Sequence, residues 1–168
     1  ELNIQQVHEG LSSKQFSSGE VTKACFDKIK EKDEDLNAFI TITEDRAQQE
    51  AAKIDAKIKQ GTKIKVLEGV PVAIKDNIML SSVKATAGSN ILSTYVAPYD
   101  ATVIEKLKKQ GSVFLGKTNM DEFAMGGSGE TSFFGPARNP HNLDKVPGGS
   151  SSGSAVAVAS NESIYALG

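Results

Sequence analysis

A glycine- and serine-rich loop that runs straight into an apolar segment is the feature that most constrains the fold of this chain. The loop is PGGSSSG, residues 147–153, and the small apolar segment SAVAVA, residues 154–159, follows without a break. A flexible linker has a similar composition, but a linker does not normally lead into a segment that must be buried. A phosphate-binding loop needs a lysine beside its last glycine, and Ser154 occupies that place. We therefore expect an ordered loop whose serine hydroxyls can serve as nucleophile, proton relay or hydrogen-bond donor.

Several amphipathic helices are predicted before this loop. Residues 17–20, SSGE, form a capping box with Ser17 as the N-cap. The helix that follows carries an apolar stripe, on which Cys25 is a small core residue. Another helix is expected over 44–60 with Gly61 as its stop, and a third begins at the cap Asp100 and ends at Lys109. The residues expected to face inward are Leu2, Ile4 and Val7 in a short first helix, then Val21, Cys25 and Ile29, and later Val103, Ile104 and Leu107.

Three apolar segments are predicted to be strands. They are residues 39–43, the run that starts near Pro71 and ends at Lys75, and residues 112–116. Because a helix, a glycine and an apolar strand follow one another, the pattern is typical of the α/β class. Asn119 is expected to cap a further helix with Glu122 three residues on, and a short helix is considered at Ile91. Residues 117–129 then lie where open α/β sheets bind ligands, at the carboxyl ends of strands.

The charge and the few metal-binding side chains exclude some classes of protein. The net charge is −2 and the predicted pI is about 5.8, so there is no basic footprint for nucleic acid. The single cysteine, Cys25, excludes an internal disulfide, and His8 and His141 are too far apart for a local metal motif. No apolar run approaches the roughly 20 residues of a membrane span, and the first residues do not resemble a signal peptide. We expect the cytosol or an organelle matrix.

Lys75 is the most informative side chain outside the loop. It follows the apolar run VPVAI, and lysine is rarely buried unless it is paired or used. Desolvation lowers the pKa of a lysine, which is how a lysine becomes a general base. A lysine at a strand end that reaches solvent is the alternative, and the residues alone do not decide between the two. No His–Asp pair competes for the role, because His141 lies in an Asn/Pro-rich turn and His8 near the N-terminus.

At the serine-rich loop the chain resembles a known family. GGSSSGSAVAVA, residues 148–159, is similar to the core motif GGSSGGSA of the amidase signature family, with Ser152 where the motif has glycine. The segment GKTNMDEFAMGGSGETSFFGPARNP, Gly116 to Pro140, resembles one branch of that family, the A subunits of glutamyl-tRNA(Gln) amidotransferases. The resemblance runs from about Ser18 to residue 168. It implies the N-terminal part of a mixed central sheet flanked by helices, with a mainly helical layer over 1–62 and the start of the α/β core over 63–168 in one incomplete domain.

The resemblance also implies a Ser-Ser-Lys mechanism of amide cleavage. Lys75, in the motif K-D-N, corresponds to the base, and Ser150 corresponds to the relay serine, which follows a cis peptide bond. Gly148, Gly149 and Ser151 would support the loop. The family's nucleophilic serine and its oxyanion-hole backbone belong to a segment beyond residue 168. We therefore expect the 168-residue chain alone to be inactive.

Met125, Gly126, Gly127 and Ser128 correspond to a wall of the family's glutamine site. The alternative for Met125 is a helix C-cap with its side chain in the core. The resemblance further implies two partners, a larger tRNA-binding subunit together with a small third subunit, in a heterotrimer that amidates glutamyl-tRNA(Gln). No cofactor is expected in this chain, and ATP and Mg²⁺ would act in the larger partner. A stand-alone amide hydrolase of the same family and an inactive truncated or interaction chain are the alternatives.

Overall fold

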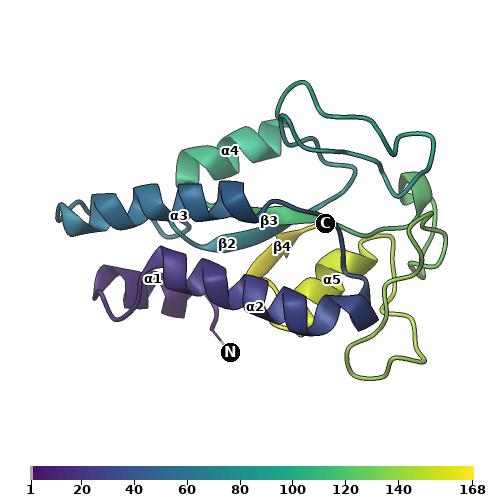
Figure 1. Cartoon of the computed structure of the whole chain (residues 1–168), viewed down its shortest axis with the longest axis horizontal. Helices are drawn as coiled ribbons and strands as arrows, with labels where there is room; N and C mark the ends of the chain where they lie inside the picture. Colours follow the sequence, from purple (N-terminus) through teal and green to yellow (C-terminus); the bar gives the residue numbers. More distant parts are fainter. Residues whose placement is uncertain (1) are drawn as a thin grey trace.

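The computed structural model describes residues 2–168 and shows a mixed β-sheet between two layers of helices (Figure 1). The strands are β1 (Phe39–Ile42), β2 (Pro71–Lys75), β3 (Val113–Thr118) and β4 (Tyr165–Leu167). The helices are α1 (Ile4–Ser12), α2 (Ser18–Leu36), α3 (Glu44–Lys59), α4 (Thr102–Gln110) and α5 (Ser152–Ala159), with a short 3₁₀ turn η1 (Glu122–Ala124). This architecture confirms the predicted α/β class.

The order of the strands puts polar strand ends at one edge of the sheet. The order is β1-β3-β2-β4, with β2 parallel to both β3 and β4 and β1 antiparallel to β3. Lys75 at the end of β2 lies opposite Thr118 at the end of β3. Because the carboxyl ends of parallel strands meet at the same edge, the segments after β2 and β3 leave the sheet close to each other and to the end of β4.

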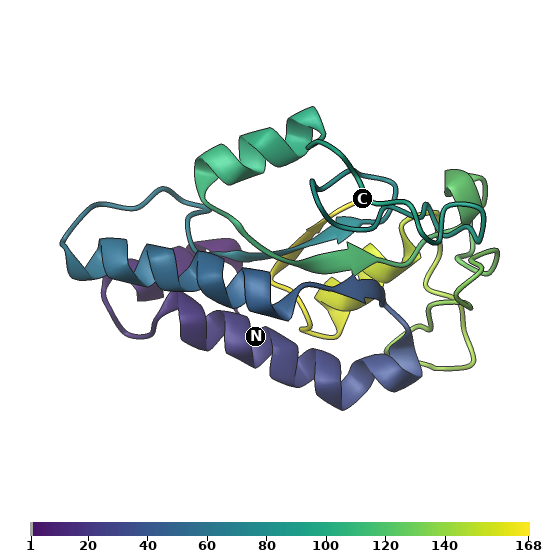
Figure 2. The ribbon, with the colours of Figure 1, turned by 45° about the horizontal axis from the view of Figure 1, so that its top comes forward.

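Helices lie on both faces of the sheet (Figure 2), and alternate residues of the inner strands pack against different helices. Ala73 and Leu115 belong to a core cluster with residues of α2, α3 and α5, whereas Ile74 and Phe114 belong to a cluster with Ile104 of α4. The two-residue period of a strand explains this separation. Every residue of β2 and β3 is buried, as expected for strands covered on both faces.

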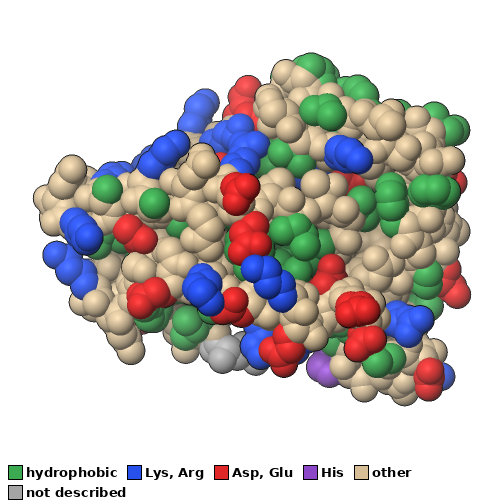
Figure 3. Space-filling model, viewed as in Figure 1, with side chains coloured by type: hydrophobic (Ala, Val, Ile, Leu, Met, Phe, Trp, Pro, Cys, Tyr) green, Lys and Arg blue, Asp and Glu red, His purple; other side chains and the backbone are tan. Residues whose placement is uncertain are grey.

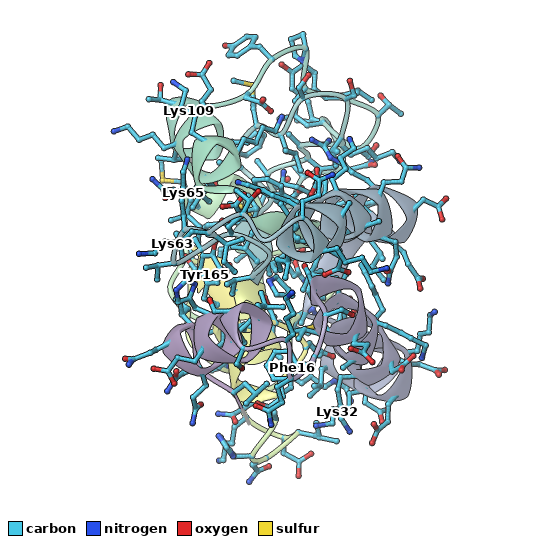
Figure 4. The ribbon with its side chains drawn as sticks, turned by 90° about the vertical axis from the view of Figure 1, so that its left-hand side faces the viewer. Phe16, Lys32, Lys63, Lys65, Lys109 and Tyr165 are labelled. Carbon is cyan, nitrogen blue, oxygen red and sulfur yellow. The ribbon has the colours of Figure 1, made fainter. Side chains whose placement is uncertain are left out.

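The N-terminal helix covers a third apolar cluster at the end of the molecule shown in Figure 4. Val7 and Leu11 of α1 are fully buried there with Val70. The ring of Phe16 lies against Gly10, where a Cβ atom would be 2.1 Å from the ring, so a side chain at that position would displace the ring.

Several local predictions are confirmed. Ser17 accepts a hydrogen bond from the Glu20 N–H, and the Glu20 side chain accepts from the Ser17 N–H, which is the predicted capping box. Cys25 is buried on α2, and burial raises the pKa of its thiol to about 12. Gly61 follows α3 with φ +77°. β2 starts at Pro71 and is an inner strand.

Two predicted helix caps are wrong. The N-cap of α4 is Ala101, not Asp100, and the Asp100 carboxylate instead accepts hydrogen bonds from the Ser81 N–H and the Lys108 ammonium. Asn119 caps no helix. Its amide group donates to the carbonyl oxygens of residues 37 and 135, at 3.0 and 2.9 Å. In both cases a tertiary partner takes the side chain that the local spacing assigned to a cap.

Other predictions are wrong because the side chains concerned are exposed to solvent. Leu2 and Val103 are predicted to face inward, but their exposed fractions are 40% and 41%. The residues after Asn90 form turns rather than a helix, and Ile91 is 82% exposed.

Hydrophobic side chains gather on the right-hand side of the face in Figure 3, which is the side where the loops after β2 and β3 lie in Figure 1. Over residues 2–168, none of the helices is both long and apolar enough to cross a membrane.

Candidate active site

Lys75 and Ser150 meet at the carboxyl end of β2. The Lys75 side chain is buried, and its Nζ atom donates to Ser150 Oγ at 2.8 Å and to Ser151 Oγ at 2.7 Å. The two serines precede α5, which packs on β2, β3 and β4. The sequence left open whether Lys75 is buried or reaches solvent at the strand end. In the structure Lys75 does not extend into solvent but contacts two hydroxyl groups.

Burial lowers the pKa of Lys75, and the negative charge of Asp121 opposes that shift. The net direction is downward, so a larger fraction of Lys75 is neutral at a given pH than for a lysine in water. A neutral amine in contact with a serine hydroxyl can accept its proton. The pair Lys75–Ser150 therefore has the geometry and the electrostatic environment of a base and a proton relay.

The start of α5 is anchored on the ends of two other strands. Ser154 Oγ lies 2.7 Å from Thr118 Oγ1 at the end of β3 and donates to the carbonyl of Leu167 in β4. Gly153 is packed so closely that a Cβ atom would lie 2.2 Å from the Ala38 carbonyl oxygen. These contacts fix the loop residues relative to Lys75.

The loop itself has special backbone geometry. Gly148 has φ +91°, a conformation that glycine adopts without strain. The peptide bond between Gly149 and Ser150 is cis, as the family resemblance implies. Ser152, which stands where the family motif has glycine, is the first residue of α5 and is fully buried. A serine therefore fits this position.

Met125, Gly126 and Gly127 lie near the same loop but differ in environment. A Cβ atom at Gly149 would lie 3.1 Å from the carbonyl carbon of Gly127, so these two segments are in contact. A Cβ atom at Gly126 would clash with the Asp121 carboxylate, whereas at Gly127 nothing lies within 4 Å. Met125 is 83% exposed, which excludes the alternative that its side chain belongs to the core.

Two buried groups of charged residues were missed by the sequence reasoning. The first is Asp121, whose carboxylate lies beneath Gly149. The second is the fully buried pair of Lys117 and Asp76, with Nζ and Oδ1 3.2 Å apart. A usable signal existed, because each of these residues lies at or just after the end of a buried strand, where ligand sites form in α/β proteins.

The histidines do not contribute to this site. His8 belongs to α1, and His141 is exposed in a turn. Over residues 2–168, no group of three or more His, Cys, Asp and Glu side chains is arranged to hold a metal ion. A groove of about 420 Å³ lies elsewhere, lined mainly by α2 and by residues 161–164, and neither Lys75 nor Ser150 lines it.

Comparison with known proteins gives consistent matches. Residues 20–168 match the family model described as Amidase. The chain is 51% identical over 165 residues to the A subunit of glutamyl-tRNA(Gln) amidotransferase from Endomicrobium trichonymphae, a match that covers 98% of this chain and 34% of that protein. The protein of the same name from Carboxydothermus hydrogenoformans is 48% identical over 167 residues, with 99% and 34% covered. The chain thus spans about a third of the length of these relatives.

Solved structures give the same result for the fold. The native peptide amidase from Stenotrophomonas maltophilia superposes with a TM-score of 0.90 at 34% identity, over 97% of this chain and 35% of that chain. The A subunit of glutamyl-tRNA(Gln) amidotransferase from Thermotoga maritima superposes with a TM-score of 0.79 at 37% identity, over 100% of this chain and 34% of that chain. The similarity to the Thermotoga maritima protein covers the whole chain and therefore includes the sheet and the serine-rich loop.

Proposed function

The chain belongs to the amidase family, and on that basis we propose that it is part of the glutaminase subunit of a tRNA-dependent amidotransferase. This subunit releases ammonia from glutamine, and the ammonia amidates glutamyl-tRNA(Gln) in a partner subunit. The contact of 2.8 Å between Lys75 Nζ and Ser150 Oγ is the observation that carries the proposal. The names of the relatives, which are A subunits of such enzymes, support the choice of substrate.

In the proposed mechanism Lys75 is the base and Ser150 is the relay. Neutral Lys75 takes the Ser150 proton while Ser150 takes the proton of a nucleophilic serine, which attacks the amide carbon of glutamine. Collapse of the tetrahedral intermediate returns a proton to the leaving nitrogen and gives ammonia and a glutamyl ester, which water then hydrolyses to glutamate. The nucleophile is assigned to a segment after residue 168. Such a segment would begin beside the site, because a Cβ atom at Gly168 would lie 2.8 Å from Ser151 Oγ.

The remaining roles follow the same assignment. Gly148, Gly149 and Ser151 support the relay loop, and Met125, Gly126, Gly127 and Ser128 form a wall of the glutamine site. The enzyme is a heterotrimer that also contains a larger tRNA-binding subunit, together with a small third one, in the bacterial cytoplasm or an organelle matrix. ATP and Mg²⁺ act in the larger partner. The 168-residue chain alone is inactive, so an electrophile that traps serine acyl-enzymes is expected to label the full-length protein and not this chain.

The test is the Lys75→Ala variant of the full-length protein, assayed with its partner subunits for release of glutamate from glutamine. General base catalysis contributes roughly 10²- to 10⁴-fold, so we expect at least a hundredfold loss of activity. Lys63→Ala is the matched control, because Lys63 is exposed and lies far from the loop in sequence. Glutaminase activity that survives in Lys75→Ala would remove Lys75 from the mechanism.

A stand-alone amide hydrolase is the second candidate function. The similarity to a peptide amidase, with a TM-score of 0.90 at 34% identity, supports it. The two functions are separated by adding the partner subunits. Glutaminase activity that rises with the partners supports the amidotransferase, whereas partner-independent hydrolysis of simple amides supports the second candidate.

A further inference from the structure

Asp121 lies directly beneath the loop that carries Ser150. Its side chain is fully buried between β3 and η1, and its backbone N–H donates to the Ser150 carbonyl at 3.1 Å. A Cβ atom at Gly149 would lie only 2.2 Å from Asp121 Oδ2. The carboxylate and the loop are therefore in van der Waals contact on one side and joined by a main-chain hydrogen bond on the other.

The surroundings of Asp121 stabilise the ionised carboxylate. Oδ2 accepts from the Gly129 N–H at 3.0 Å, and Oδ1 accepts from the Thr131 hydroxyl at 2.9 Å and the Thr131 N–H at 3.3 Å. Burial raises the pKa of Asp121. The three hydrogen-bond donors, led by the Thr131 hydroxyl, and the charge of Lys75 lower this pKa by more than burial raises it, so the net shift is downward. A buried carboxylate with three donors keeps its charge at neutral pH.

Asp121 and Lys75 both contact the 149–151 loop, so the negative charge of Asp121 lies close to Lys75. The two side chains attract each other, which favours the protonated form of Lys75 against the effect of burial. Asp76, the residue after Lys75, instead faces Lys117 and Thr86. The hydroxyl groups of Ser150 and Ser151, which contact Lys75 Nζ, carry no charge.

We propose that Asp121 is a positioning residue that fixes the 149–151 loop against the end of β2 and places a negative charge beside the loop that Lys75 contacts. Through this charge it sets the pH at which Lys75 becomes neutral and able to act as a base. The kinetic part of this proposal rests on the proposed function, since it assumes that Lys75 is the base. The effect on the protonation of Lys75 does not depend on that assumption.

The experiment uses the full-length protein with its partners and measures glutaminase kcat/KM across pH. Activity is expected to rise with pH as Lys75 loses its proton. Asp121→Asn removes the charge with little change of shape, and we expect the acid limb of the profile to move to lower pH by roughly one unit. Thr131→Val is the matched control, because it removes a donor to the same carboxylate and keeps the charge. Its acid limb should coincide with that of the wild type, even if its kcat falls.

A second neutral variant and a second measurement keep the proposal testable if Asp121→Asn does not fold or the protein has no glutaminase activity. Asp121→Ser is expected to shift the profile in the same direction if Asp121→Asn does not fold. Competitive acetylation of Lys75, quantified by mass spectrometry across the same pH range, follows the protonation of Lys75 without needing turnover. We expect the midpoint of labelling to fall in both neutral variants and to stay unchanged in Thr131→Val.

The outcomes separate the two proposals. A wild-type protein without glutaminase activity would refute the proposed function, and the labelling would still decide the effect of Asp121 on Lys75. Equal labelling midpoints in the wild type and the folded neutral variants would overturn the inference. Loss of kcat in Asp121→Asn and Thr131→Val with unmoved acid limbs would also overturn it, because Asp121 would then only support the loop.

Discussion

Replacing Lys117 by methionine tests the buried ion pair behind the candidate site. Lys117 and Asp76 are both fully buried, and Lys117 Nζ donates to Asp76 Oδ1 and to the Asp76 carbonyl at 3.2 Å and to the Lys84 carbonyl at 3.3 Å. Methionine has nearly the same length but no charge and no donor. The Lys117→Met variant therefore leaves a buried carboxylate without its cation.

The magnitude follows from what remains around Asp76. Breaking a buried pair by removing one partner typically costs about 3–5 kcal/mol. Asp76 Oδ2 keeps two donors, the N–H and the hydroxyl of Thr86, which places the expected loss near the lower end, at about 3 kcal/mol. The exposed pair of Lys23 and Asp27 gives a contrast, because its side chains are 68% and 56% exposed and such pairs contribute about 0–1 kcal/mol.

The assay is urea unfolding of the purified protein, followed by circular dichroism. Lys117→Met should lower the free energy of unfolding by about 3 kcal/mol, and Lys23→Met should change it by less than about 1 kcal/mol. The double variant Lys117→Met/Asp76→Asn should recover part of the loss, because no uncompensated charge is left. A Lys117→Met variant as stable as Lys23→Met would refute the reasoning.

Three further predictions concern stability. Gly153→Ala should cost about 1–3 kcal/mol or more in urea unfolding, because its Cβ atom would lie 2.2 Å from a backbone oxygen, whereas Gly127→Ala, with open space around it, should leave stability unchanged. Burial, aided by the charge of Asp33, raises the pKa of Glu162 from its ordinary value of 4.5 to about 8. The contribution of Glu162 to stability should therefore be greatest below pH 4.5 and fall by roughly a few kcal/mol as the pH rises to about 8. In Glu162→Gln that fall should vanish from unfolding curves recorded between pH 4.5 and 8, and an identical pH dependence would contradict the assignment. Ser17→Ala removes the side-chain acceptor at the start of α2 and should lower the free energy of unfolding by about 1 kcal/mol, and an unchanged urea midpoint would contradict the capping box.

Much of the fold follows from local patterns. The capping box at Ser17, the buried position of Cys25 and the inner strand that begins at Pro71 were all predictable, because each depends on residues close together in the sequence. The failures at Asp100 and Asn119 have the opposite cause. Each side chain has a capping residue type at a capping position, and each is bound by a group that the fold brings from elsewhere.

In the candidate site, too, the residues that belong to local motifs were predictable and the residue that depends on distant contacts was not. Lys75 and Ser150 were predicted from motifs within single segments, and their contact required only that the two segments meet. The position of Asp121 just after a buried strand places it near a site but does not indicate its role, because its donors lie 8 and 10 residues further along the chain and the glycine above it 28 residues further. Spacing in the sequence does not reveal such an arrangement, since it depends on how three loops stack at the edge of the sheet.

The order of the strands has a consequence for the newly made chain. Lys75 and Ser150 are separated by 75 residues, which corresponds to about 4–15 s of synthesis at typical rates. During that interval β2 can pair with β3, but its other side, which β4 will occupy, has no neighbour. A nascent chain therefore carries an unpaired, apolar strand edge next to a lysine that still lacks its serines, and this is the stage at which a chaperone would protect the protein from aggregation.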